Sequence, residues 1–139
     1  MAAVYHNRLE IGMPMQADPT IVYALEKAHR YDGNIRKEDL GLDSPYNTYK
    51  YAGLPPGPIA SPGKASIEAA LMPADVPYLY FVSRNDGSHV YAKTLAEHAR
   101  NVKKFQVDYF RQQRQAARAT ARPTSASRAG ARSSRAPAP

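Results

Sequence analysis

The pattern of hydrophobic and polar positions predicts short helices joined by loops, with one β-hairpin late in the chain. Apolar residues recur at helical spacing in several segments, and the predicted helices cover residues 2–11, 18–28, 61–72 and 94–110. A single helical turn is expected over residues 36–40. The predicted fold class is therefore α+β and mainly helical.

Cap residues predict where two of these helices begin. Asp18 is followed by Pro19, and Ser61 by Pro62, so that each pair fits an N-cap residue with proline at the first helical position. We therefore expect Asp18 and Ser61 to cap the helices that follow them.

Residues 78–92 have the composition of a β-hairpin. Aromatic and β-branched residues fill two short segments on either side of Asp86-Gly87, a dipeptide typical of tight turns. Directly after the hairpin, Thr94 and Glu97 have the spacing of a capping box, which predicts the start of the last helix.

A long loop over residues 43–61 lies between the early and late helices. Its four prolines and two glycines exclude a helix or a central strand, and its tyrosines are Tyr46, Tyr49 and Tyr51. Because proline lowers the entropy lost on folding, we expect the loop to hold aromatic and amide groups in fixed positions beside a binding cleft. The alternative is that the tyrosines cover a core and the prolines wrap around the outside.

Charge divides the chain near residue 110. Residues 1–110 hold 12 Lys+Arg and 12 Asp+Glu, whereas residues 111–139 hold seven Arg, no acid and no large apolar residue. We therefore predict a folded part, 1–110, and a largely disordered tail, 111–139. The arginines lack the interleaved aromatic residues that would indicate specific nucleic-acid binding. Contact with anionic lipid or wall polymer suits such a tail as well as contact with nucleic acid does.

The sequence has no pattern for a metal centre, a cofactor or a nucleophilic triad. Cysteine is absent, and the four histidines are scattered without ligand spacing. Neither a glycine-rich phosphate loop nor a Gly-x-Ser-x-Gly motif is present. We therefore expect no metal and no cofactor. No apolar run approaches the roughly 20 residues of a membrane-spanning helix.

Seven motifs follow one another in a fixed order, from Asn7-Arg8-Leu9 to Gly87-Ser88-His89. Between these two lie segments 15–23, 31–34, 44–49, 53–59 and 78–82. Together they resemble the endolytic murein transglycosylase family, also called YceG-like and formerly labelled aminodeoxychorismate lyase. The resemblance runs from the first residues to about Gln106, and only the arginine-rich tail lies outside it.

The resemblance implies a bacterial enzyme that is anchored in the inner membrane and faces the periplasm. Such an enzyme cleaves MurNAc–GlcNAc bonds within nascent peptidoglycan strands, beside the cell-wall synthesis machinery, and leaves 1,6-anhydroMurNAc ends. The family domain is similar to lysozyme-like lytic transglycosylases. One glutamate acts first as general acid and then as general base.

The chain departs from the family pattern at that glutamate. In the family it lies just before the Asn-Arg-Leu segment, in an Ala-Ser-Ile-(Ile/Val)-Glu-Lys-Glu type motif, which this sequence lacks. Glu10 does not match its position. In the family a transmembrane helix and a small LysM-like module precede the catalytic domain, and we expect both to be missing from this chain as well. We therefore expect an N-terminally truncated, C-terminal portion of the catalytic domain that has no catalytic residue and is inactive alone.

The resemblance, together with the tyrosines and amides of the sequence, indicates candidate substrate-binding residues. They are Asn7, Gln16, Asp18, Thr20, Tyr46, Asn47 and Tyr49. The amides could orient sugar hydroxyls, but bonding to the local backbone is at least as common. The alternative function is a peptidoglycan-binding or scaffold module that uses the same cleft without cutting.

Overall fold

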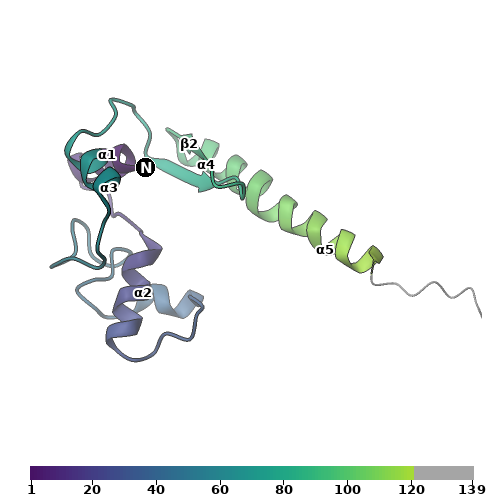
Figure 1. Ribbon diagram of the computed structural model, residues 1–139, viewed down its shortest axis with the longest axis horizontal. Coiled ribbons are helices and arrows are strands. Elements are labelled where there is room, and N and C mark those ends of the chain that lie inside the picture. Colours follow the sequence, from purple (N-terminus) through teal and green to yellow (C-terminus); the bar gives the residue numbers. More distant parts are fainter. Residues whose placement is uncertain (121–139) are drawn as a thin grey trace, which may run out of the picture.

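The computed structural model describes residues 1–120, which form short helices around one antiparallel hairpin (Figure 1). The helical elements are α1 (Ala2–Glu10), α2 (Asp18–Lys27), the 3-10 turn η1 (Lys37–Gly41), α3 (Lys64–Leu71), α4 (Leu95–Val102), the π-helical turn η2 (Lys103–Asp108) and α5 (Tyr109–Thr120). Strands β1 (Tyr80–Ser83) and β2 (His89–Ala92) lie between α3 and α4. The predicted α+β, mainly helical class is confirmed. Across residues 1–120, no helix combines the length and the apolar character needed to cross a bilayer.

Helix α1 ends at a glycine with a left-handed backbone conformation. Gly12 has a φ of +69°, and its N–H donates to Leu9 O at 3.2 Å. The Met13 N–H donates to Arg8 O at 2.8 Å, so that carbonyls of the last turn are satisfied. The chain can therefore leave α1 in a tight turn, and Val4 on this helix is buried in the core.

The N-cap of helix α2 lies one residue earlier than predicted. Its N-cap is Ala17, whose carbonyl accepts a hydrogen bond from the Thr20 N–H at 3.0 Å, and no side chain caps the helix. Asp18 is therefore the first helical residue, and the prediction that it caps α2 is wrong. The Asp18 carboxylate instead accepts a hydrogen bond from the hydroxyl of Tyr49.

Helix α3 also begins elsewhere than predicted. Gly63 takes the N-cap position, and its carbonyl accepts a hydrogen bond from the Ile67 N–H at 3.2 Å, so the predicted start at Ser61 is wrong. The helix lies beside α1, where the His6 ring approaches Ala70 O at 2.8 Å (Figure 1). None of its residues is buried, and the side chain of Leu71 is among the most exposed of the large apolar groups.

The predicted hairpin and capping box are both confirmed. Strands β1 and β2 pair antiparallel, with Phe81 opposite Tyr91. At the start of α4, the Thr94 hydroxyl accepts from the Glu97 N–H at 3.2 Å, and the Glu97 carboxylate accepts from the Thr94 N–H at 3.4 Å. These reciprocal bonds fix the angle at which the last helix leaves the hairpin.

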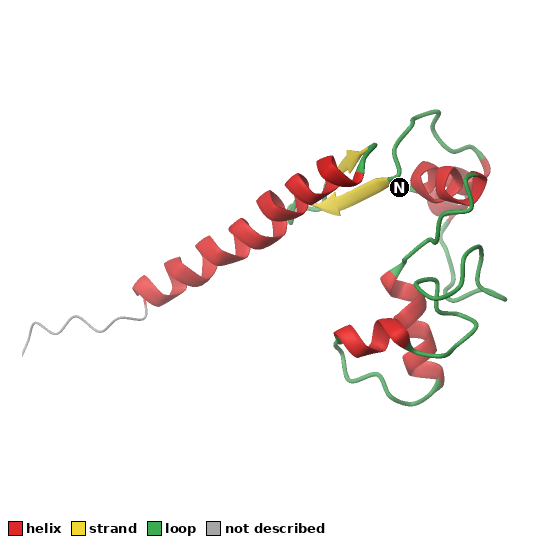
Figure 2. Cartoon of the chain, turned by 180° about the vertical axis from the view of Figure 1, so that it is seen from behind, coloured by secondary structure: helices red, strands yellow, loops and turns green. Residues whose placement is uncertain are grey.

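Elements α4, η2 and α5 follow one another without a break, and the π-helical turn η2 contacts the loop end of the hairpin. The Asn85 amide donates to Phe105 O at 2.6 Å, and the Gln106 amide donates to Ser83 O at 3.1 Å. Both bonds tie η2 to the loop end of the hairpin. Helix α5 then projects away from the other elements (Figure 2), with no buried residue. It extends ten residues beyond the predicted end at Phe110, and residues 121–139 of the predicted tail lie outside the described residues.

Candidate functional site

Asn47 holds the first half of the long loop from its buried interior. Its Nδ2 donates to Leu40 O at 3.0 Å and to Leu42 O at 2.8 Å. Its Oδ1 accepts from the backbone N–H groups of Tyr49 at 2.9 Å and Lys50 at 3.3 Å. The side chain thus stabilises the irregular backbone on both sides of it. Because Asn47 is 0% exposed, its side chain is not accessible to a ligand.

Two buried threonines join this loop to the start of α2. The Thr20 hydroxyl donates to Ala17 O at 2.6 Å, so Thr48 is the donor in the 2.8 Å bond between the two hydroxyls. The Thr48 hydroxyl also accepts from the Ala17 N–H at 3.0 Å. One residue before, the Gln16 N–H donates to Thr48 O at 3.2 Å, and Gln16 is held at a positive φ of +49°. These bonds hold the backbone from which the side chains of Gln16 and Asp18 project.

A cavity of about 570 Å³ opens between α1, the start of α2, β1 and α4. This volume is within the range of ligand-binding clefts. Polar and aromatic side chains from all four elements and from the loop line it, among them Tyr5, Arg8, Gln16, Asp18, Tyr49, Tyr80 and His98. We take this cavity as the candidate site.

Three of the predicted site residues meet at this cavity. Gln16, Asp18 and Tyr49 line it together, and the Tyr49 hydroxyl donates to the Asp18 carboxylate at 2.5 Å. The bond links the loop to the first turn of α2 and holds the phenol ring at the rim of the cavity.

The other four predicted residues lie outside the cavity. Asn47 and Thr20 are buried and satisfy backbone groups. The Asn7 amide donates to Val76 O at 2.7 Å and to Tyr78 O at 2.9 Å, and so it positions the segment that leads into β1. Tyr46 packs against Tyr23, with ring centroids 4.7 Å apart, below the ammonium of Lys27. In this structure these four residues shape the surroundings of the site.

Burial shifts the pKa of three side chains that line the cavity. Burial raises the pKa of Tyr49 well above its ordinary value, and the bond to Asp18 raises this pKa further. Burial also raises the pKa of Tyr5, and it lowers the pKa of His98, with a smaller contribution from Arg8. At neutral pH the two phenols are therefore protonated and the imidazole is neutral. The charged side chains among the lining residues are those of Arg8 and Asp18.

The sequence did not single out several residues that line the cavity. Arg8 and Tyr5 lie one turn apart on α1, and Tyr80 and His98 come from β1 and α4. The Tyr80 and His98 rings stack with centroids 5.1 Å apart. The spacing of Tyr5 and Arg8 on one helix face was a signal for such a site, whereas the meeting of β1 with α4 depends on tertiary packing.

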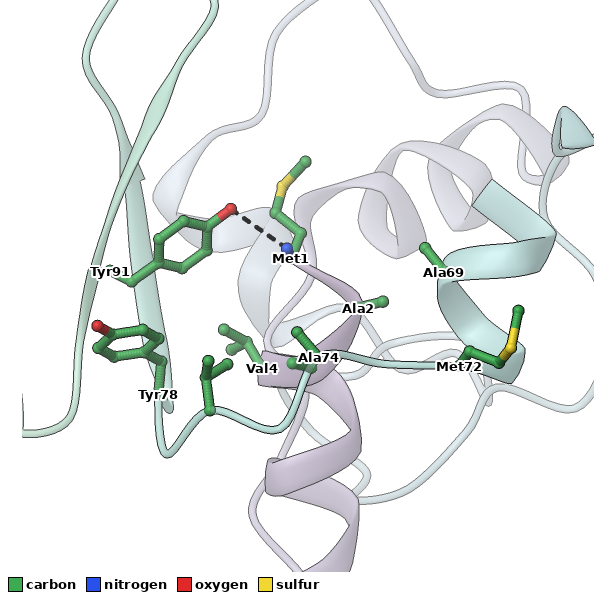
Figure 3. A pocket seen from close by; sticks show the side chains of 10 residues that line it. Met1, Ala2, Val4, Ala69, Met72, Ala74, Tyr78 and Tyr91 are labelled. Atoms are coloured by element: carbon green, nitrogen blue, oxygen red, sulfur yellow. Dashed lines mark hydrogen bonds between the residues drawn. The ribbon is translucent and has the colours of Figure 1, made fainter. Parts of the chain in front are cut away.

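A second cavity of about 420 Å³ is mostly apolar. It lies between α1, α3 and the segment before β1, and Figure 3 shows Tyr78 and Tyr91 on one side of it and Ala69 and Met72 on the other. The Tyr91 hydroxyl accepts a hydrogen bond from the chain's amino group at 3.2 Å. No charged side chain is among its lining residues.

The chemistry of the candidate site favours binding of a polar ligand with apolar faces. Tyrosine rings and amides can stack on sugar rings and bond to hydroxyls. Asp18 is the one carboxylate among the lining residues, and it is engaged as an acceptor of Tyr49. Glu10 is exposed and is not among them. Residues 1–120 contain no cluster of three potential metal ligands.

Comparison with known proteins gives consistent matches. The sequence model described as "YceG-like family" matches residues 1–104. A Bacillus subtilis protein named endolytic murein transglycosylase is 48% identical over 105 residues, which cover 76% of this chain and 28% of that protein. A Streptococcus pneumoniae protein of the same name is 38% identical over 106 residues, covering 73% of this chain and 19% of that protein.

A solved structure matches as well. The crystal structure of a yceG-like protein from Listeria monocytogenes has a TM-score of 0.63 and 46% sequence identity. The match covers 71% of this chain and 31% of that chain. The chain thus spans less than a third of the length of the relatives it matches.

Proposed function

Because this chain belongs to the YceG-like family, we propose that it forms part of an endolytic murein transglycosylase and supplies substrate-binding surface. The substrate is the glycan strand of nascent peptidoglycan, cut between MurNAc and GlcNAc with formation of a 1,6-anhydroMurNAc end. The whole protein acts at the periplasmic face of the inner membrane, beside the synthesis machinery.

The observation that carries this proposal is the cavity where Gln16, Asp18 and Tyr49 meet. The Tyr49 phenol is fixed by its bond to Asp18 and stays protonated, so its ring offers an aromatic face at low entropic cost. The stacked pair of Tyr80 and His98 lines the same cavity. Flat rings interspersed with hydrogen-bonding groups suit a chain of pyranose sugars.

The chain's own residues do not supply the proton that the reaction needs. Cleavage without water requires a neutral carboxyl group that first protonates the glycosidic oxygen and then, as carboxylate, takes the proton of the MurNAc C6 hydroxyl. Asp18 accepts a hydrogen bond from Tyr49 and so is placed as an acceptor, not as a donor. We therefore propose that the chain alone binds glycan without cutting it.

Binding and cleavage can be measured separately on purified glycan strands. We expect the chain to bind the strands, and Tyr49→Ala to weaken binding about tenfold, which corresponds to about 1.4 kcal/mol. Tyr51→Ala is the matched control, because Tyr51 lies on the same loop outside the cavity lining and its hydroxyl donates to exposed Asp43. This control should bind like the unchanged chain.

Liquid chromatography with mass spectrometry would detect any anhydro-muropeptide released in the same samples, and we expect none. Release of this product would contradict the proposal that the chain alone binds glycan without cutting it. Asp18 would then again be a candidate for the acid. Absence of glycan binding, or an equal loss in both variants, would contradict the assignment of the cavity.

A further inference from the structure

The last part of the helix that follows the hairpin carries positive charge without acidic partners. Asp108 is the only acidic residue between residues 103 and 120. The basic residues of this segment are Lys103, Lys104, Arg111, Arg114 and Arg118. Three ion pairs are formed within residues 1–120, all of them between residues 32 and 68, so none involves these five side chains. Their charge is therefore available to a partner outside the chain.

Side-chain exposure shows which side of this segment faces away from the hairpin. In η2, Phe105 and Gln106 are half-buried, and both residues form hydrogen bonds with the hairpin. Val107 and Phe110, by contrast, have 46% and 42% of their surface exposed. Residues three apart are neighbours on a helix surface, so these two apolar side chains lie side by side on the outward side.

The arginines of α5 continue this outward side. Arg111 follows Val107 by four residues and Arg114 follows Phe110 by four, the spacing of neighbours along one side of a helix. Arg118 follows Arg114 by four again, and all three arginines are exposed. Helix α5 projects away from the other elements, so this side is open to a large partner (Figure 2). We call these five residues, three cationic and two apolar, the outer face.

Like charges along one side of a helix lower its stability. Arg114 and Arg118 repel each other at four-residue spacing, and α5 has no acidic side chain to offset this. Packing does not compensate either, since α5 buries no residue. In the sequence, residues 121–139 add four more arginines and no acidic residue. An extended anionic partner would remove the repulsion along α5.

We propose that the outer face docks α5 on the surface of an anionic phospholipid bilayer. The inference does not rest on the proposed function. The arginines would bind the headgroup phosphates, and Val107 and Phe110 would enter the boundary between headgroups and acyl chains. A soluble polyanion such as polyphosphate would bind the arginines but would not shelter the two exposed apolar side chains. The combination of both kinds of side chain on one face therefore favours lipid.

Co-sedimentation with sucrose-loaded vesicles measures this docking on the full chain. We expect the chain to sediment with vesicles of phosphatidylglycerol and phosphatidylcholine in equal parts, and to stay in solution with phosphatidylcholine alone. High salt should weaken the binding. Absence of binding to the mixed vesicles, or equal binding to both kinds, would overturn the proposal. Full release from the mixed vesicles by polyphosphate of equal phosphate content would overturn it in favour of a soluble polyanion.

A triple variant removes the charge of the outer face. Arg111→Gln, Arg114→Gln and Arg118→Gln together should lower the partition coefficient for the mixed vesicles by about tenfold or more. The matched control is Arg30→Gln with Lys37→Gln, which changes exposed basic residues of another part of the chain and should have little effect. A triple variant that binds like the unchanged chain would refute the role of α5.

A second variant moves the charge without changing its amount. It adds Gln113→Arg, Ala116→Arg and Thr120→Arg to the triple variant, so the net charge is that of the unchanged chain. The arginines then lie two residues further along, about 200° around the helix axis from Val107 and Phe110. We expect its binding to stay well below that of the unchanged chain. Equal binding would show that net charge alone acts, and the outer face would be overturned.

The apolar part of the outer face distinguishes lipid from a soluble polyanion. Val107→Ser with Phe110→Ser should bind the mixed vesicles about tenfold more weakly and polyphosphate as before. Leu54→Ser with Leu71→Ser, at exposed positions elsewhere, is the control and should bind like the unchanged chain. Unchanged vesicle binding by a Val107/Phe110 variant that is folded by circular dichroism would contradict docking on a bilayer. If this variant does not fold, the two kinds of vesicle and polyphosphate decide on the unchanged chain.

The outcomes are independent of the proposed function. Failure to bind vesicles would overturn the docking of α5 but would leave glycan binding at the candidate cavity in place. Loss of glycan binding, in turn, would leave the vesicle result standing, because no residue of the outer face lines that cavity.

Discussion

The two halves of the long proline- and tyrosine-containing loop are held in different ways. Residues 43–51 contain one of its four prolines but are anchored by the buried side chains of Asn47 and Thr48. Residues 52–61 contain the other three prolines and bury nothing, and α3 after them buries nothing either. Proline lowers the entropy cost of order but supplies no contact, whereas buried polar side chains satisfy the backbone itself. The candidate site is built on the anchored half.

The largest effect should come from removing the anchor. Asn47→Ala leaves two carbonyls and two N–H groups without their partner, and we expect the free energy of unfolding to fall by about 3–4 kcal/mol in urea titrations. Asn34→Ala, which shortens an exposed loop amide, should cost less than about 0.5 kcal/mol. A loss below about 1 kcal/mol for Asn47→Ala would show that water replaces the anchor, and the contrast between the halves would fail.

A smaller effect should appear at high pH through Tyr49, the residue by which the anchored half reaches α2. Burial and Asp18 raise the pKa of Tyr49. Above about pH 10 the folded state therefore keeps the phenol proton that the unfolded chain has lost. Stability from this group is complete below about pH 10 and falls as the pH rises further. In Tyr49→Phe, the unfolding free energy should therefore decline less steeply above pH 10. Identical slopes for both proteins would contradict the assignment.

The smallest effect is expected in the unanchored half. Leu71 on α3 is 77% exposed, and Leu71→Ser should change the unfolding free energy by less than about 0.5 kcal/mol. Leu25→Ser, at a fully buried position of α2, should cost about 3 kcal/mol or more. A cost above about 1 kcal/mol at Leu71 would mean that α3 packs against another surface in solution, and the two halves would then be alike.

The elements that could be predicted from sequence are those encoded by local signals. The Asp86-Gly87 turn between aromatic segments indicated the hairpin, and the capping box of Thr94 and Glu97 indicated α4. The predicted caps Asp18 and Ser61 were wrong because cap residues compete with other partners and positions. Tyr49, 31 residues away, binds the Asp18 carboxylate, and Gly63 serves as N-cap in place of Ser61.

The site could be predicted only in part, because its residues come together through contacts between segments that are distant in the sequence. The family resemblance indicated Gln16, Asp18 and Tyr49, which the structure brings together. It could not separate them from Asn47, because a loop asparagine has the same donors and acceptors whether it binds backbone or ligand. Arg8 shares a helix face with Tyr5, but the sequence contained no hint of its partners, because these are main-chain carbonyls.

The π-helical turn η2 has a geometric consequence for the end of the chain. A π turn accommodates one more residue than an α-helical path between the same two points. Deleting a single residue within Lys103–Asp108 would therefore allow a continuous α-helix between the same two points and leave the later side chains pointing as before. A deletion within α5 itself would instead turn every side chain after it by about 100° about the helix axis. The π turn thus makes η2 the place in the last helix where one residue can be lost while the arginines of α5 keep their direction relative to the hairpin.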